Sequence, residues 1–215
     1  MTAPNRATLW GETIVEELAE SGVTGAVVSP GSPSTPLTVA LADHPEITTY
    51  SVLDERSAAY FALGRGKRTG RPTPLICTSG TAAANFHPAV VEADRGRVPL
   101  VVLTADRPPE LHDSGANQTV DQLKLYGDAV RWFRQLPEPA AEARTVRSLR
   151  TSVGRALAES TGAPAGRLSI RRQGVYVPVS CVRASTWPSM ASPSAAASAS
   201  PGRSRVVSSA NSLKR

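Results

Sequence analysis

The sequence contains little cysteine and no long apolar run. Among its 215 residues only Cys77 and Cys181 are cysteines, and they lie 104 residues apart. This excludes a disulfide scaffold and a cysteine-rich zinc site, and it is typical of a reducing cytoplasm. No stretch approaches the roughly 18 apolar residues of a membrane span, and residues 1–8 lack the pattern of a secretory signal. The sequence therefore predicts a cytoplasmic protein without a membrane partner.

Acidic residues are missing from the last part of the chain. Residues 167–215 hold eight Lys and Arg and no Asp or Glu, whereas residues 1–166 hold 16 Lys and Arg against 18 Asp and Glu. The net charge of +6 therefore comes from the last segment. Residues 188–202 are almost entirely Ser, Ala and Pro, a composition that cannot bury enough apolar surface to fold. We predict a disordered basic tail over 167–215, and its few aromatic residues disfavour nucleic-acid binding.

The first 166 residues alternate between helical and strand patterns. Apolar spacing predicts the helices, and continuous β-branched or apolar runs predict the strands. The expected helices are 8–20, 37–42, 55–70, 82–94 and 140–160, and the expected strands are 25–29, 47–52, 74–78 and 98–104. Such alternation predicts an α/β fold, a parallel sheet with helices on both faces. The loops after its strands, where such folds place function, are 29–36, 54–55, 79–81 and 105–118.

Familiar nucleotide, nucleophile and metal motifs are incomplete. Gly64–Gly70 has neither the G-x-G-x-x-G spacing nor a Walker A ending. Ser79 lacks the glycines two positions before and two positions after it that a nucleophile elbow requires. The three histidines have no metal-ligand spacing. The turn at Ser79 still offers free backbone N–H groups at the start of a helix, which attract hydrogen-bond acceptors.

Two charged residues follow predicted strands. Glu55 opens a helix, where the helix dipole alone favours a carboxylate. Arg107 is followed by two prolines, so it is preorganised to bind a carboxylate or phosphate. The alternative for Arg107 is a surface ion pair with Asp106 or Glu110.

Five segments, in order, resemble the N-terminal, pyrimidine-binding domain of thiamine-diphosphate-dependent enzymes. Within that group they resemble the MenD family, the 2-succinyl-5-enolpyruvyl-6-hydroxy-3-cyclohexene-1-carboxylate synthases of menaquinone biosynthesis. The first three segments are partly shared with relatives such as acetolactate synthase, whereas the last two are specific to the MenD family. The segments are SPGSPSTPL at 29–37, DERSAAYFALG at 54–64, TSGTAAAN at 78–85, TADRPPEL at 104–111 and SGANQT at 114–119.

The resemblance implies a cofactor, two substrates and a set of site residues. Glu55 matches the catalytic glutamate that hydrogen-bonds the aminopyrimidine ring of thiamine diphosphate and favours its imino tautomer, which takes the proton from thiazolium C2. Ser79 and Gly80 match cofactor-binding positions. The family is a transferase family that adds 2-oxoglutarate to isochorismate with loss of CO₂. The positions that match its substrate contacts are Ser32, Arg107, Asn117 and Gln118.

The sequence departs from the family pattern in two places. Pro33 stands where the family has arginine, which removes a cation facing the substrate carboxylates. The Gly-Asp-Gly motif that holds magnesium and the diphosphate in the longer family members is absent, so no metal ligand is assigned.

The family pattern breaks near Gly166, and we attribute this break to a reading-frame shift or a truncated gene. We therefore expect a domain at 1–166 that is inactive alone, in a homo-oligomer or with a separate C-terminal chain. The pyrimidine domain of another thiamine-diphosphate carboligase, or a non-catalytic interaction module, remains an alternative.

Overall fold

The computed structural model describes residues 5–162 and 174–180. The other residues of the predicted tail, which include all of 188–202, lie outside the described residues. Within the described chain, six strands form one sheet in the order β2-β1-β3-β4-β6-β5, and every neighbouring pair is parallel. The strands are β1 (Gly25–Val28), β2 (Thr48–Ser51), β3 (Thr73–Cys77), β4 (Leu100–Asp106), β5 (Val130–Phe133) and β6 (Gly174–Ser180).

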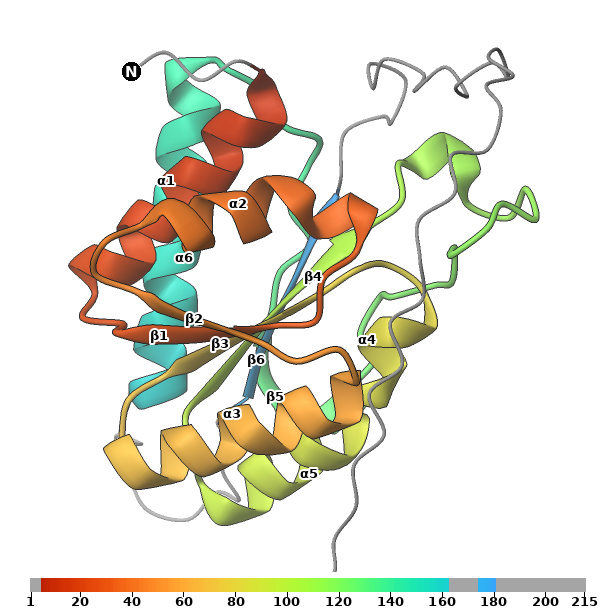
Figure 1. Cartoon of the computed structure of the whole chain (residues 1–215). Helices are drawn as coiled ribbons and strands as arrows, with labels where there is room; N and C mark the ends of the chain where they lie inside the picture. Colours follow the sequence, from red (N-terminus) through yellow and green to blue (C-terminus); the bar gives the residue numbers. More distant parts are fainter. Residues whose placement is uncertain (1–4, 163–173, 181–215) are drawn as a thin grey trace, which may run out of the picture. The chain divides into compact units, whose positions relative to one another are not determined.

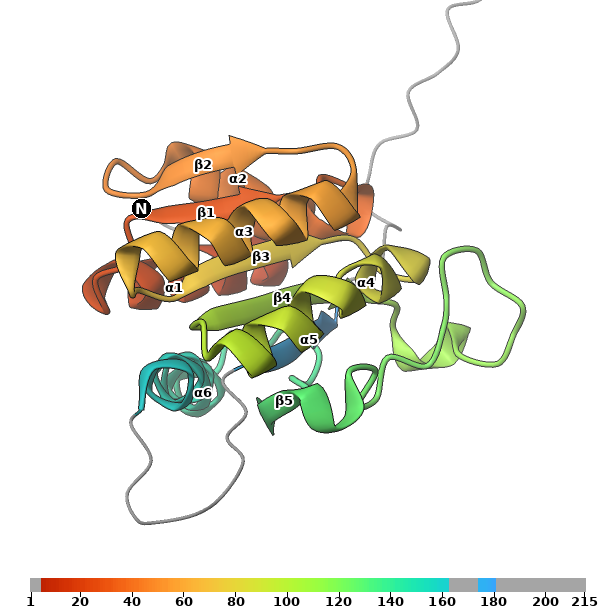
Figure 2. The same ribbon diagram turned by 90° about the horizontal axis from the view of Figure 1, so that it is seen from below.

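Helices cover both faces of this sheet (Figure 1). On one face lie α1 (Arg6–Glu20), α2 (Thr35–Asp43) and α6 (Ala143–Thr161). On the other lie α3 (Glu55–Thr69), α4 (Thr81–Asn85) and α5 (His87–Gly96), and Figure 2 shows α3 and α5 running along the strands. The predicted α/β fold is confirmed.

Alternate residues of the central strands supply two apolar cores. Val28 and Ile76 face the core under α1, α2 and α6, whereas Val27 and Leu75 face the core under α3, α4 and α5. Successive side chains of a strand point to opposite faces, so a strand covered on both sides is apolar throughout. This is why β1, β3 and β4 are buried at every position.

The structure adds two strands to the four that the sequence predicts. β5 is only four residues long and has no flanking pattern that marks it. β6 lies within the segment predicted as tail and pairs with β4 from Gly174 to Ser180, so the sheet extends beyond residue 166. Pro178, which has no N–H to donate, lies beyond the part of β6 that pairs with β5.

The helix predicted over 82–94 is two helices, α4 and α5. The break falls at Phe86, two residues before Pro88. Proline has no backbone N–H and clashes with the preceding turn, so it is tolerated only near the start of a helix. Among the described residues, no helix is both long and apolar enough to cross a membrane.

Candidate active site

The loops that follow β1, β2, β3 and β4 meet at one edge of the sheet. Parallel strands end at the same edge, and Val28 pairs with Ile76 while Cys77 pairs with Thr104. Two contacts tie the loop after β1 to its neighbours. The Ser29 hydroxyl donates to the Val52 carbonyl at 2.9 Å, and the Ser29 N–H donates to the Ile76 carbonyl at 2.8 Å.

Glu55 is the first residue of α3 at this edge. Asp54 caps the helix, because its carboxylate accepts the Ser57 N–H at 2.7 Å, and this hydrogen bond lowers the pKa of Asp54. Glu55 is half-buried. Burial raises the pKa of the Cys77 thiol well above its ordinary value, and the Glu55 carboxylate raises it further. The charge of Glu55 therefore acts at the end of β3, the strand that leads into Ser79 and Gly80.

Ser79 and Gly80 form a buried turn between β3 and α4. Gly80 has φ +83° and ψ −145°, a backbone conformation that residues with a side chain rarely adopt. A Cβ at Gly80 would lie 3.1 Å from three backbone atoms of Gln118, and the Ser79 hydroxyl donates to the Gln118 carbonyl at 2.9 Å. The predicted cofactor residues and one predicted substrate residue are therefore in direct contact.

Thr78 is a residue at this edge that the sequence analysis did not single out. Its hydroxyl is buried and has no hydrogen-bond partner. The backbone of Gly31 packs so closely on it that a Cβ at Gly31 would lie 2.4 Å from the Thr78 Cβ. Its position just before Ser79 is the only signal that could have drawn attention to it.

Arg107 follows the last residue of β4. Its own N–H, not its guanidinium, donates to the buried Asp106 carboxylate, at 2.8 Å. The Nε atom of Arg107 is buried and has no hydrogen-bond partner. An unpaired buried donor of this kind suits an anionic ligand.

The other predicted substrate residues, Ser32, Asn117 and Gln118, are exposed to solvent. Ser32 is exposed in a short 3-10 helix (Ser32–Ser34), in which Pro33 is buried. Asn117 and Gln118 are exposed in the long loop after β4, and Gln118 has φ +56°. The buried amide of Gln122, which no sequence signal marks, donates to the Ala105 carbonyl at 3.0 Å and leaves its own oxygen without a partner.

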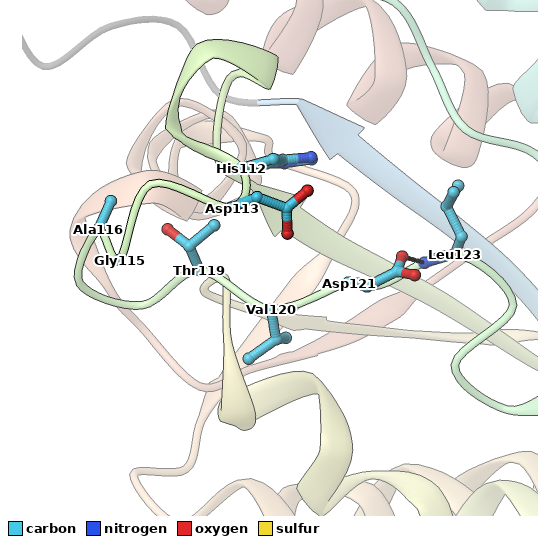
Figure 3. A pocket seen from close by; sticks show the side chains of 8 residues that line it. All are labelled: His112, Asp113, Gly115, Ala116, Thr119, Val120, Asp121 and Leu123. Carbon is cyan, nitrogen blue, oxygen red and sulfur yellow. Dashed lines mark hydrogen bonds between the residues drawn. The ribbon is translucent and has the colours of Figure 1, made fainter.

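The same long loop contains a surface pocket of about 310 Å³ (Figure 3). None of the predicted site residues lines it. Its lining residues are His112, Asp113, Gly115, Ala116, Thr119, Val120, Asp121 and Leu123. No group of three or more His, Cys, Asp or Glu side chains in the described part of the chain is placed to hold a metal ion.

A family model, the thiamine pyrophosphate enzyme N-terminal TPP-binding domain, matches residues 10–125. The chain belongs to this family. The matched range holds Glu55, Ser79, Gly80 and the long loop after β4, so the family domain includes the edge described above.

Individual relatives carry a more specific name. A 2-succinyl-5-enolpyruvyl-6-hydroxy-3-cyclohexene-1-carboxylate synthase of Haloarcula marismortui is 70% identical over 166 residues, which cover 77% of this chain and 28% of the relative. Proteins of the same name from Haloquadratum walsbyi and Crocosphaera subtropica are 68% identical over 166 residues and 56% identical over 149 residues. These alignments cover 77% and 69% of this chain and 27% and 26% of the relatives. The matching part thus spans little more than a quarter of each relative. The resemblance to the MenD family is confirmed.

Proposed function

We propose that this chain supplies the pyrimidine-binding half of a thiamine-diphosphate site of the MenD type. In this proposal Glu55 is the catalytic carboxyl, Ser79 and Gly80 lie against the cofactor, and the substrates are 2-oxoglutarate and isochorismate. The observation that carries the proposal is that Glu55 opens α3 at the same edge of the sheet where β3 ends and the turn of Ser79 and Gly80 leads into α4.

The residues at this edge fit an aminopyrimidine ring. The half-buried carboxylate of Glu55 can hydrogen-bond a ring nitrogen, and the unpartnered hydroxyl of Thr78 can donate or accept. Gly80 has no side chain, so a flat group can approach its backbone closely. When bound, thiamine diphosphate supplies the nucleophilic carbon that attacks a 2-oxo acid. Glu55 holds and exchanges the proton of that ring nitrogen at its carboxylate.

The substrate side of the proposal depends on Arg107. Both proposed substrates carry carboxylates, and the buried Nε–H of Arg107 lacks an acceptor. Ser32, Asn117 and Gln118 are proposed to contribute polar contacts from exposed loops. Pro33 offers no donor to the substrate carboxylates, so we expect weaker substrate binding than in a chain with arginine at this position.

A partner chain is also part of the proposal. Leu53 is 84% exposed, and Tyr60 and Phe61 on α3 are each 45% exposed. Such apolar side chains beside the site indicate contact with another chain. We propose that a second copy or a separate C-terminal chain covers them. The magnesium and diphosphate ligands must come from the separate chain, because this sequence contains no Gly-Asp-Gly. A cytoplasmic location is proposed as well, since Cys77 is a buried free thiol.

A chimera tests the role of Glu55. Residues 1–166 are joined to the C-terminal part of the Haloarcula marismortui relative, and turnover of 2-oxoglutarate and isochorismate is measured. Glu55→Gln should keep the fold and lower turnover about 10²–10⁴-fold, because an amide cannot exchange the proton. Glu46→Gln, at an exposed turn, is the control and should leave turnover unchanged. An unchanged rate in Glu55→Gln would show that Glu55 is only a helix-end carboxylate.

The chain by itself provides a second test. With thiamine diphosphate and magnesium, the purified 215-residue protein should not convert the two substrates, because this sequence contains no Gly-Asp-Gly. In the chimera, Pro33→Arg should raise turnover. Turnover by the chain alone above a blank without protein would contradict the proposal that it supplies only half of the site.

A further inference from the structure

The backbone of Arg107 is held on both sides by side chains. Its N–H donates to Asp106 Oδ1 at 2.8 Å, and its carbonyl accepts from His112 Nε2 at 3.0 Å. Pro108 and Pro109 follow, and each fixes φ and removes an N–H group. The direction in which the Arg107 side chain leaves the backbone is therefore set by Asp106 and His112.

These two side chains also lie close to each other. His112 Nε2 is 3.7 Å from Asp106 Oδ1, and the Asp106 side chain is almost fully buried. A carbonyl oxygen only accepts hydrogen bonds, so Nε2 must carry the proton in this contact. The His112 side chain is 31% exposed and forms one wall of the pocket in Figure 3. His112 thus joins the wall of that pocket to the backbone of Arg107.

We propose that His112 is a positioning residue for Arg107. Its Nε2–H fixes the Arg107 carbonyl and thereby holds the buried Nε–H of Arg107 in place for a carboxylate ligand. The inference rests on the proposed function in one respect, namely that Arg107 binds the carboxylate of a substrate. Without the donor of residue 112, the Arg107 carbonyl is no longer held, although the Leu111 and His112 N–H groups still donate to the Pro108 and Pro109 carbonyls. The Nε–H of Arg107 then becomes more accessible to water.

Hydrogen exchange of the Arg107 Nε–H tests the positioning role without any ligand. The exchange rate is measured by ¹⁵N NMR on the full 215-residue chain. His112→Ala should speed this exchange about tenfold, which corresponds to the loss of one hydrogen bond. His112→Gln should restore slow exchange, because its amide N–H can donate to the same carbonyl. His44→Ala is the control, since His44 accepts a hydrogen bond from the Glu46 N–H in a turn before β2.

The backbone amides of β3 and β4 separate positioning from general stability. In His112→Ala they should exchange at the wild-type rate, because the change is confined to the turn after β4. If His112→Ala leaves the Arg107 Nε–H exchange unchanged, or speeds that of β3 and β4 equally, the proposal is wrong.

Titration with 2-oxoglutarate separates this inference from the proposed function. Isothermal titration calorimetry gives the affinity of each variant, including Arg107→Ala, which has no Nε–H signal. His112→Ala should weaken binding about tenfold, His112→Gln should restore it, and Arg107→Ala should abolish it. If Arg107→Ala binds like the wild type, the proposed substrate role of Arg107 fails. If only Arg107→Ala weakens binding, the role of His112 fails alone. If no variant binds 2-oxoglutarate, the exchange measurement decides the role of His112.

Discussion

Replacing Gly80 by alanine tests the turn that joins β3 to α4. Gly80 has φ +83°, and a Cβ there would lie 3.1 Å from the Cα, carbonyl carbon and oxygen of Gln118. Ordinary contacts of a Cβ fall between 3.4 and 4 Å, so the loop at Gln118 must move away. The same movement strains the hydrogen bond from the Ser79 hydroxyl to the Gln118 carbonyl.

The expected cost follows from this geometry. A non-glycine residue in such a backbone conformation costs about 1–3 kcal/mol, and the close contact with Gln118 adds to that cost. Gly64→Ala is a matched control, because a Cβ at Gly64, inside α3, would meet no atom within 4 Å beyond the adjacent backbone of α3 itself. Alanine is favoured over glycine in a helix by about 0.5–1 kcal/mol, so this control should stabilise the protein.

Urea unfolding, followed by tryptophan fluorescence, measures both variants. The melting temperature of a chain of this size changes by about 2–4 °C for each kcal/mol, which provides an independent measurement. Gly80→Ala should unfold at lower urea than the wild type, and Gly64→Ala at higher urea. A Gly80→Ala protein within roughly 0.5 kcal/mol of the wild type would refute the argument from backbone strain and contact.

Three further changes test the packing around the site. Cys77 has a raised pKa in the folded chain. Its contribution to the free energy of unfolding is therefore fully present below about pH 9.0 and is lost as the pH rises above that value. In a Cys181→Ala background, the free energy of unfolding should fall with pH above 9.0 by up to about 1.4 kcal/mol per unit, and Cys77→Ala should remove that slope. Tyr126→Phe removes a buried hydroxyl that donates to the Ala83 carbonyl at 2.7 Å and should cost about 0.5–1.5 kcal/mol in urea unfolding. Trp10→Phe removes the indole N–H that donates to the Ala140 carbonyl at 2.8 Å, and a thermal melt should show a loss of about 1–3 kcal/mol. If one of these variants behaves like the wild type, that result contradicts the role given to the contact that the variant removes.

Sequence patterns predicted the α/β class because the signals involved are local. The apolar runs of β1, β3 and β4 indicate strands covered on both faces, and the helices between them require parallel pairing. The position of Glu55 follows in the same way, since Asp54 is a favourable N-cap and Glu55 begins the helix. The parallel order of the strands by itself predicts that the loops after them meet at one edge of the sheet.

Contacts between distant residues were decided only by the tertiary structure. Neither the contact of Ser79 with Gln118, 39 positions later in the chain, nor the packing of Gly31 on Thr78 leaves a periodic signal in the sequence. β5 and β6 gave no local prediction either, and they belong to the sheet because their backbones pair with each other and β6 pairs with β4. Local propensity and periodicity specify single elements, whereas hydrogen bonds and close packing between elements depend on where the folded chain brings them together. The sequence therefore determined which residues lie at the edge of the sheet, and the tertiary structure decided which of them touch.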